Sequence, residues 1–244
     1  MAQLQAQGGI VACVVVLLGM LGIWNVSAQP VDPCTVTGAQ LNTEQLGPLL
    51  SPAEVALFKK YVGQARYYFE TGSGGSTFIA SGMPNLKRIE VVESDVTWLN
   101  KLRKYKPVHD AMCVHKKLRM HHVDVGAKPN AIGVPHDSSM KSMWTLYGGA
   151  IALYAGSPWE AKPDLVFVDG RFRVAAVMHA YKVIDEGALI MMHDYDRKQY
   201  HVVETVVRKV EQVERLAVFK VTNRTATTMA LAEQLLHRYG HVYL

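Results

Sequence analysis

The chain has 244 residues, of which 49% are hydrophobic and 19% charged, and its formal net charge is +5. This length is typical of one well-filled α/β domain, and no low-complexity tract interrupts it. The basic residues are spread along the chain rather than gathered in an arm, which argues against nucleic acid as a partner.

The N-terminal segment has no charged side chain before Asp32, and Ile10–Trp24 is a continuous apolar run. The run is shorter than the roughly 20 residues of a membrane-spanning helix and fits a signal-peptide core, with small residues at 26–28 as a cleavage site. We expect residues 1–28 to be a cleaved signal peptide. An uncleaved signal anchor, attached to a membrane through residues 10–26, and a buried helix are the alternatives. Either form of signal places the protein in the secretory-pathway lumen, outside the cell or on a membrane.

Three cysteines are consistent with such a compartment. Cys13 lies in the apolar run, which leaves Cys34 and Cys113 for the mature protein. They could form one disulfide in an oxidising compartment, or remain two unrelated thiols, and the sequence leaves both open.

Residues 29–50 are expected to be a polar linker and residues 51–244 one domain. Ser51-Pro52-Ala53-Glu54 begins the domain with the pattern of a capping box, and a helix should follow to about Tyr61. Strands are predicted at Ala65–Glu70, Arg88–Glu93, Leu118–Val125, Asp164–Asp169, Ala188–His193 and Leu216–Val221. Helices are predicted between them, at Thr77–Gly82, Val96–Lys104, Ser139–Tyr154, Arg173–Ile184 and Tyr200–Val213. This alternation predicts a doubly wound α/β fold on a mostly parallel sheet.

A glycine-rich loop follows the first strand, where an open α/β sheet binds its ligands. Gly72-Ser73-Gly74-Gly75-Ser76-Thr77 resembles a dinucleotide fingerprint, but Thr77 stands where that motif needs a very small residue. Glu70 precedes the loop and is better suited to an ammonium group than to a pyrophosphate. A nicotinamide or nucleotide-sugar enzyme is therefore disfavoured.

The pattern Glu70-x-Gly72-x-Gly74 resembles the first motif of class I S-adenosylmethionine-dependent methyltransferases. The resemblance covers about residues 67–221 and implies a seven-stranded Rossmann-like sheet. It is closest to small stand-alone methyltransferase-like proteins with a "VDGRFRVA" segment, here residues 168–175. It implies that the loop approaches the methionine part of S-adenosylmethionine, that an acid after the second strand holds the ribose, and that a third acid lies near the adenine. The implied cofactor site is Glu70, Gly72, Ser73, Gly74, Glu93, Ser94 and Asp124.

Two further strand ends carry groups that could act on an acceptor. Asp169 ends the fourth strand, and His193-Asp194 end the fifth. The arrangement resembles catechol-type and sugar-modifying O-methyltransferases, in which acids at these positions hold a divalent cation such as Mg²⁺. Asp169 and Asp194 are the implied ligands. The catechol-type pattern has Asp-Asn where this chain has His193-Asp194, so His193 or Asp169 acting as a general base without metal is the alternative.

Arg171 and Arg173 follow Asp169 directly. Two guanidinium groups at the mouth of the site would suit an anionic acceptor, or one of them could pair with Asp169 and begin the next helix. Farther along, Arg197, Tyr200, His201 and Glu204 could line the cleft, although an ordinary polar helix start is favoured. Aromatic residues of the long crossover 126–162, including Trp144, Tyr147 and Tyr154, are expected mainly to pack in the core.

The sequence therefore predicts an S-adenosylmethionine-dependent methyltransferase, acting on a hydroxyl of a small-molecule or glycan-like acceptor. The catalytic residues would be Asp169, Arg171, Arg173, His193 and Asp194. The alternative is a catalytically inactive methyltransferase-like module with a binding or structural role in the secretory pathway or at a membrane.

Overall fold

A single seven-stranded sheet organises the chain, in the order β3-β2-β1-β4-β5-β7-β6. The structure is a computed structural model that describes residues 34, 41–128, 133–155 and 161–243. Strands β1 to β5 run parallel, whereas β7 pairs antiparallel with both β5 and β6. This is the doubly wound, mostly parallel α/β fold that the alternation of strands and helices predicted.

The strands are β1 (Tyr67–Thr71), β2 (Arg88–Glu93), β3 (Leu118–His122), β4 (Leu165–Val168), β5 (Leu189–Met192), β6 (Arg208–Val213) and β7 (Leu216–Lys220). The α-helices are α2 (Pro52–Val62), α3 (Gly75–Gly82), α4 (Val96–Leu102), α5 (Lys106–His109), α6 (Lys141–Gly148), α7 (Ala150–Tyr154), α8 (Arg173–Val183) and α9 (Ala226–Tyr239). Short helical turns lie at Asp110–Val114, Ser138–Met140 and Lys198–Thr205.

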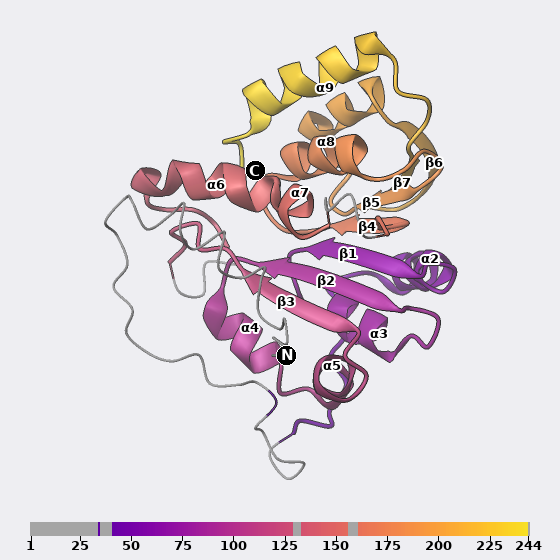
Figure 1. The fold of residues 1–244 in the computed structure, drawn as a ribbon, viewed down its shortest axis with the longest axis vertical. Helices are drawn as coiled ribbons and strands as arrows, with labels where there is room; N and C mark the ends of the chain where they lie inside the picture. Colours follow the sequence, from indigo (N-terminus) through magenta and orange to yellow (C-terminus); the bar gives the residue numbers. More distant parts are fainter. Residues whose placement is uncertain (1–33, 35–40, 129–132, 156–160, 244) are drawn as a thin grey trace, which may run out of the picture. The chain divides into compact units, whose positions relative to one another are not determined.

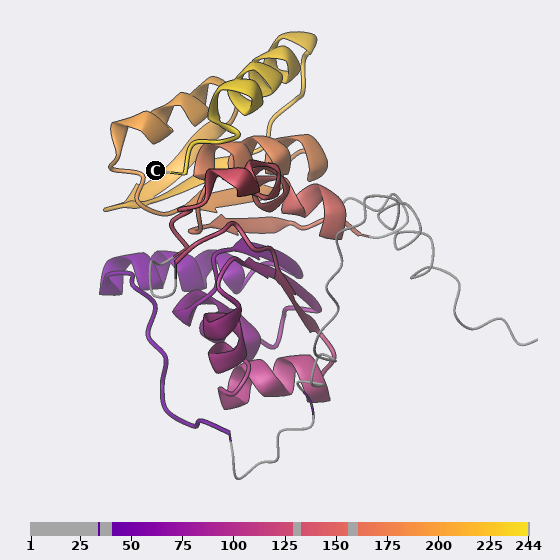
Figure 2. The same cartoon turned by 90° about the vertical axis from the view of Figure 1, so that its left-hand side faces the viewer.

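Two hydrophobic cores sandwich the sheet because successive side chains of each strand point to opposite faces. Tyr67 and Phe69 join the core formed with α6, α7, α8 and α9, whereas Tyr68 joins the core formed with α2, α3 and α5. Figure 1 shows α8 between the sheet and α9, and Figure 2 shows the same layers from the side. Strands covered on both faces explain the continuous apolar runs in the sequence.

All six strand predictions are confirmed, but the helix predicted at Tyr200–Val213 is wrong. The chain forms a 3₁₀ turn at Lys198–Thr205 and then the edge strand β6, which is paired only with β7. Its exposed, charged residues resemble a solvated helix face, and the β6–β7 hairpin, rather than local sequence, makes them a strand. Helix α9, which packs on α8, was not predicted.

Residues expected to form a linker make specific contacts with the domain. Asn42 donates its backbone N–H to the carbonyl of Lys104 at 2.8 Å and accepts from Lys106 N at 2.8 Å. Gly47 and Pro48 lie against Gly75, where a Cβ would come within 2.1 Å of Pro48 N. This part of residues 29–50 therefore packs against the amino end of α3.

The predicted N-terminal signal lies outside the described residues. Within the part of the chain that the structure describes, no helix is long and apolar enough to cross a membrane. Cys34 and Cys113 are both disulfide-bonded. The alternative of free thiols at these two positions is therefore not what the structure has.

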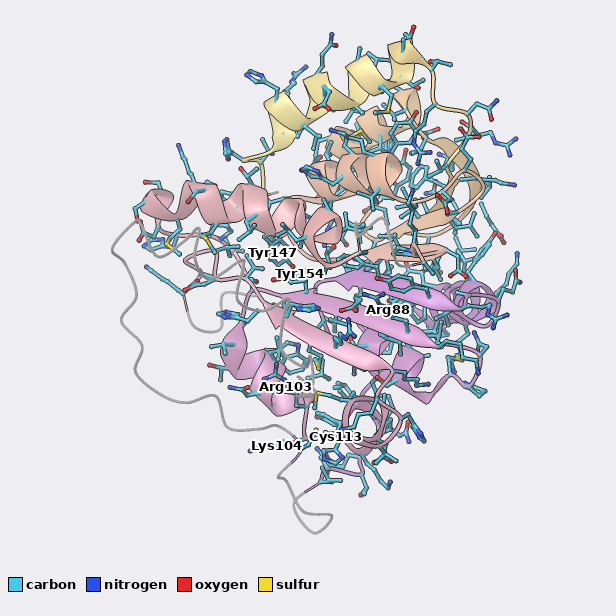
Figure 3. All side chains as sticks on the ribbon, in the orientation of Figure 1. Arg88, Arg103, Lys104, Cys113, Tyr147 and Tyr154 are labelled. Carbon is cyan, nitrogen blue, oxygen red and sulfur yellow. The ribbon has the colours of Figure 1, made fainter. Side chains whose placement is uncertain are left out.

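A buried charge lies in the middle of β2. The Glu90 side chain is 1% exposed and pairs with Arg88 Nε at 2.9 Å and His121 Nε2 at 2.6 Å. Arg88 also donates to the carbonyl of Tyr154, and both residues are labelled in Figure 3. The Tyr154 ring stacks on His121 with ring centroids 3.7 Å apart. This cluster satisfies the buried carboxylate and belongs to the packing of the sheet.

Candidate active site

The carboxyl ends of β2, β1, β4 and β5 lie side by side at one edge of the sheet. The chain leaves β1 toward β2 on one side, while β4 lies on the other, so the topological switch point falls between β1 and β4. Ligands of open α/β sheets bind at such a point. The glycine loop after β1 and Asp169 after β4 are adjacent there, as predicted.

Gly72 connects the two loops by close backbone contact. It has φ +84°, and a Cβ on it would lie 2.5 Å from the Cα of Gly170. The backbone N–H groups of Asp169 and Gly170 both donate to the carbonyl of Thr71, at 3.0 and 2.7 Å. Gly72 is therefore needed for the close approach of the two loops.

Gly74 is the loop glycine that faces open space. A Cβ built on it would meet no heavy atom within 4 Å, and its φ of 174° is extended backbone. Its own N–H donates to Thr77 Oγ1 at 3.1 Å, and it is the N-cap of α3, so the positive end of a helix lies at the switch point. A ligand can approach the backbone here without displacing side chains.

Glu70 lies in β1 directly before the glycine loop, and its side chain turns inward. Its side chain is fully buried beneath the loop and accepts hydrogen bonds from the hydroxyls of Ser76 and Thr77. Burial raises its pKa to about 8, against the lowering effect of the two hydroxyls. A buried, protonated acid that is bonded to α3 is a poor direct ligand for an ammonium group. Glu70 instead fastens the loop to the helix.

Glu93 lies at the end of β2, as predicted, and is bonded to the glycine loop. One oxygen, Oε2, accepts from the backbone N–H and the hydroxyl of Ser73, both at 2.8 Å. The other, Oε1, accepts from the backbone N–H groups of Ser94 and Asp95 at 2.6 and 2.9 Å. A ribose diol would need these acceptor positions, and the Ser73 hydroxyl is the donor that can rotate away.

Asp124 is placed beyond β3 and is exposed. Its Oδ1 accepts from the backbone N–H of Gly126 at 2.8 Å, which is a local turn. Gly133, from the same crossover, lies over Ser94, since a Cβ on it would come within 2.6 Å of Ser94 Oγ. The crossover thus covers the end of β2, beside the acid that the resemblance assigned to the ribose.

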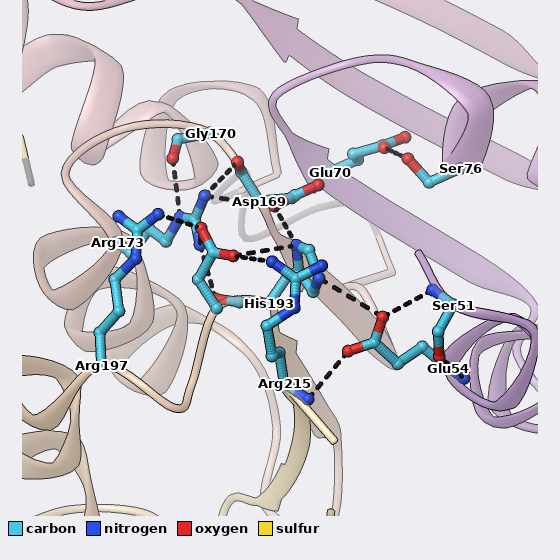
Figure 4. A network of polar contacts seen from close by, with 11 residues as sticks. Ser51, Glu54, Glu70, Ser76, Asp169, Gly170, Arg173, His193, Arg197 and Arg215 are labelled. Carbon is cyan, nitrogen blue, oxygen red and sulfur yellow. Dashed lines mark hydrogen bonds and ion pairs between the residues drawn. The ribbon is translucent and has the colours of Figure 1, made fainter. Parts of the chain in front are cut away.

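Asp169, His193 and Glu54 form a row that runs from the site into the interior (Figure 4). His193 Nδ1 lies 3.0 Å from Asp169 Oδ1, and His193 Nε2 lies 3.6 Å from Glu54 Oε2. The His193 side chain is 5% exposed and that of Glu54 is fully buried, whereas the Asp169 side chain is 28% exposed. Asp169 is therefore the member that can reach an acceptor, and His193 contacts it from the buried side.

Glu54 was recognised in the sequence only as a helix cap. It forms that cap, accepting from Ser51 N at 2.8 Å, and its other oxygen accepts from Arg215 N at 2.8 Å. Nothing in its local sequence distinguishes it from an ordinary capping box. Its contact with His193 arises because α2 packs on one face of the sheet with its first turn beside the end of β5.

Arg173 is a buried structural group and not a residue at the mouth of the site. Its side chain is 6% exposed, pairs with Asp194 Oδ2 at 2.8 Å and lies 3.3 Å from Asp169 Oδ1. It also donates to the carbonyls of Asp169, Gly170 and His193. Of the two alternatives for Arg173, the structure has the ion pair that begins a helix.

Asp194 is surrounded by guanidinium groups. Arg197 Nη2 lies 2.9 Å from its Oδ2 and Arg215 Nη1 lies 3.1 Å from its Oδ1, in addition to Arg173. Burial alone would raise the pKa of Asp194, but the charges of Arg173, His193 and Arg197 outweigh burial and lower it. Arg215 was not predicted, because it reaches this point from the β6–β7 hairpin.

These surroundings do not fit the predicted divalent cation. Asp169 and Asp194 were its expected ligands, but three arginines compete for Asp194, and a cation there would meet their positive charge. Among the described residues, no group of three or more His, Cys, Asp or Glu side chains could hold a metal ion.

Phe172 fixes the segment that carries Arg171. It has φ +56° and is fully buried, with its ring 5.9 Å from that of Trp144, 6.1 Å from that of Tyr147 and 6.2 Å from that of Tyr243. Trp144 and Tyr147 are core residues, as expected. Burial and the neighbouring charge of Arg173 lower the pKa of Arg171.

The predicted group after β5 does not share one surface. Tyr200 is buried, and Arg173 lies over its ring at 5.7 Å. His201 Nε2 lies 2.9 Å from the carbonyl of Tyr195, and Glu204 pairs with Lys209 at 3.0 Å. Arg197 pairs with Asp194 directly, whereas Tyr200 contacts Arg173, another partner of Asp194.

Two cavities lie away from this edge of the sheet. One of about 350 Å³ is at the amino ends of β1, β4 and β5, beside Ala65, Leu165 and Leu189. Another, of about 620 Å³, lies beside α3 and α5, with Ser81 and Pro107 in its lining. Neither includes the residues at the carboxyl ends of the strands.

Comparison with known proteins relates the chain to methyltransferase folds. A methyltransferase-like protein from Silicibacter pomeroyi has a similar structure, with a TM-score of 0.61, 25% sequence identity and coverage of 78% of this chain and 97% of that one. The fold is therefore Rossmann-like and of the methyltransferase type. No protein-family profile matches the sequence, and no curated protein matches it.

Weaker structural similarities are to methyltransferases as well. An O-methyltransferase from Bacillus cereus in complex with SAH has a TM-score of 0.45 and 14% identity, over 72% of this chain and 84% of that one. An RNA methyltransferase from Salinibacter ruber, in complex with S-adenosyl-L-homocysteine, has a TM-score of 0.42 and 14% identity, over 73% of this chain and 95% of that one. Similarities of this size do not bear on what this chain binds.

Proposed function

We propose that the domain is an S-adenosylmethionine-dependent methyltransferase that modifies a hydroxyl of a small polar or glycan-like acceptor. One observation carries the proposal. At the switch point, the open backbone of Gly74 lies in a loop that is bonded through Ser73 to Glu93, the acid at the end of the next strand. This is the arrangement that a nucleoside cofactor with a ribose diol needs.

The residues present fit that cofactor in the following way. Gly74 and the amino end of α3 would hold its amino acid part, and Glu93 would accept its ribose hydroxyls once the Ser73 hydroxyl rotates. Glu70, buried and bonded to α3, would keep the loop in shape. When bound, the cofactor supplies an electrophilic methyl group, so the chain must position the acceptor and take its proton.

Asp169 is the group proposed to take that proton. Its carboxylate lies at the carboxyl end of β4 beside the glycine loop and is the exposed member of the row with His193 and Glu54. His193 holds Asp169 by its Nδ1 and is a positioning residue. A carboxylate as base suits a hydroxyl acceptor, and no step in this scheme requires a metal ion.

The proposal includes a location in an oxidising compartment. Its support is the disulfide-bonded state of Cys34 and Cys113, because such bonds are rare in cytosolic proteins. S-adenosylmethionine would then have to be imported, since it is made in the cytosol. Thiol counting on protein isolated under denaturing conditions with a trapping reagent tests this point, and two free thiols at these positions would contradict it.

Calorimetric titration with S-adenosylhomocysteine tests the function. The purified chain is expected to bind, and Glu93→Ala is expected to lose at least tenfold in affinity, which is about 1.4 kcal/mol. Glu90→Ala is not a suitable control because it disrupts packing, so the exposed Glu44→Ala is used instead. No binding by a folded chain would favour the inactive binding or structural module.

A further inference from the structure

We propose that Arg197 and Arg215 form a site for an oxyanion, and that, if the proposed function holds, the acceptor carries this group. The acceptor would then be an acidic small molecule or acidic sugar, bearing a carboxylate, phosphate or sulfate. The site is separate from the cofactor residues. It lies at the carboxyl end of β5 and in the β6–β7 hairpin.

The two guanidinium groups lie next to each other because one carboxylate holds both. Arg197 Nη2 contacts Asp194 Oδ2 at 2.9 Å, and Arg215 Nη1 contacts Asp194 Oδ1 at 3.1 Å. Their side chains are 42% and 46% exposed. Each guanidinium has five N–H donors in a planar fork, and the contact with Asp194 occupies one nitrogen of each.

The charge of Asp194 is already balanced from the buried side. Arg173 Nη1 lies 2.8 Å from its Oδ2, and the Arg173 side chain is 6% exposed. Within the described residues, Asp194 is the single carboxylate that pairs with the side chain of Arg197 or of Arg215. Two exposed cations thus share an acid that a third cation neutralises, and an exposed pair of this kind favours an added anion.

Charges of both signs surround the two exposed guanidinium groups. Arg171 lies close enough to Arg173 and Arg197 for their charges to lower its pKa, after the larger effect of burial. Four arginines (171, 173, 197 and 215) therefore meet Asp169 and Asp194 at this edge, with Glu54 buried behind His193. Asp196 and Glu214 are exposed neighbours in sequence, and neither forms an ion pair among the described residues.

The position suits an anionic group on an acceptor. In the sheet order, β5 is separated from β1 by β4 alone, and strands lie about 4.8 Å apart, so Asp194 is roughly 10 Å from the glycine loop. Asp169, at the end of β4, lies between the two. An acceptor held by its anionic group at Arg197 and Arg215 could present a hydroxyl to Asp169 if one sugar ring or one aromatic ring separates the two groups.

The test is anion binding by the full chain without cofactor. The chain is titrated by calorimetry with sodium sulfate, phosphate and acetate, at an ionic strength kept constant with sodium chloride. Binding of at least one of these anions is expected, and the double variant Arg197→Gln/Arg215→Gln should weaken it at least tenfold. Arg208→Gln, an exposed arginine of β6, is the matched control and should leave it unchanged.

Circular dichroism on each variant confirms folding, and the relative affinities of the three anions identify the preferred group. The proposal is overturned if the folded wild type binds none of the three anions at concentrations up to about 0.1 M. It is also overturned if Arg208→Gln loses as much anion affinity as the double variant. Anion binding together with no S-adenosylhomocysteine binding supports the anion site and contradicts the methyltransferase. The two measurements therefore distinguish a failure of the anion site from a failure of the proposed methyltransferase function.

Discussion

Gly72 and Gly170 pack backbone against backbone, so that a Cβ on Gly72 would lie 2.5 Å from the Cα of Gly170. This contact joins the loop after β1 to the loop after β4, and with it the proposed cofactor residues to Asp169. Two glycines of one loop consequently have different roles, and substitution can separate them.

Gly72→Ala is expected to destabilise the protein by about 2–5 kcal/mol. The alanine would have to adopt a left-handed backbone conformation, and its Cβ would clash with Gly170. Gly74→Ala should change the free energy of unfolding by less than about 0.5 kcal/mol, because its Cβ meets nothing within 4 Å. It should nevertheless weaken S-adenosylhomocysteine binding about tenfold or more. Chemical denaturation and calorimetry measure the two effects. Unchanged binding in Gly74→Ala would place the cofactor elsewhere.

Ser73→Ala should strengthen S-adenosylhomocysteine binding by about two- to fivefold. The Ser73 hydroxyl donates to Glu93 Oε2 at 2.8 Å and competes with the ribose for that oxygen, and one such hydrogen bond contributes about 1 kcal/mol. Titration of the variant and the wild type side by side checks this. Weaker binding would mean that the hydroxyl itself contacts the cofactor.

Glu70 predicts a pH dependence of stability. Its pKa in the folded protein is about 8, against 4.5 for the ordinary group, so the folded state binds the extra proton between these values. The stabilisation that Glu70 contributes should therefore be fully present below about pH 4.5, fall as the pH rises to about 8 and then level off, with a slope of at most about 1.4 kcal/mol per pH unit. Urea denaturation from pH 5 to 8 should show a shallower fall in Glu70→Gln. An identical slope in both proteins would rule out a protonated Glu70.

Arg173→Met should cost about 3–5 kcal/mol of stability, because it leaves Asp194 without its buried partner and three carbonyls without a donor. Arg197→Met, which removes a half-exposed partner of the same carboxylate, should cost less than about 1 kcal/mol. Denaturation midpoints compare the pair. Equal losses would contradict the division into a structural and a surface arginine.

Asp169→Asn should lower kcat by about 10²- to 10⁴-fold for an accepted hydroxyl substrate, the usual contribution of a general base. Binding of S-adenosylhomocysteine should stay within about twofold of the wild type, since Asp169 is not among the proposed cofactor residues. Single-turnover kinetics measures the change in rate, and calorimetry measures the affinity for S-adenosylhomocysteine. A variant with full activity would remove Asp169 from the mechanism.

The sequence predicted the fold well because the parallel strands are buried on both faces and their apolar runs are unmistakable. It also placed the glycine loop, Glu93 and Asp169 correctly at strand ends, since the carboxyl ends of parallel strands meet at one edge. It failed at β6, where an exposed, charged edge strand has no apolar pattern of its own. There, pairing with β7 decides the conformation.

What the sequence could not determine is which groups turn toward solvent and which turn inward. Glu70, Arg173 and His193 have the residue types of a reactive site, but packing buries them and bonds most of their polar atoms within the fold. Glu54 and Arg215 come from a helix cap and a hairpin far away in the chain, and no local pattern marks them. Local sequence determined the parallel strands, most of the helices between them and the order of the strand ends. Only the tertiary structure, by bringing distant segments to one edge of the sheet, decided the partners and the exposure of each charge.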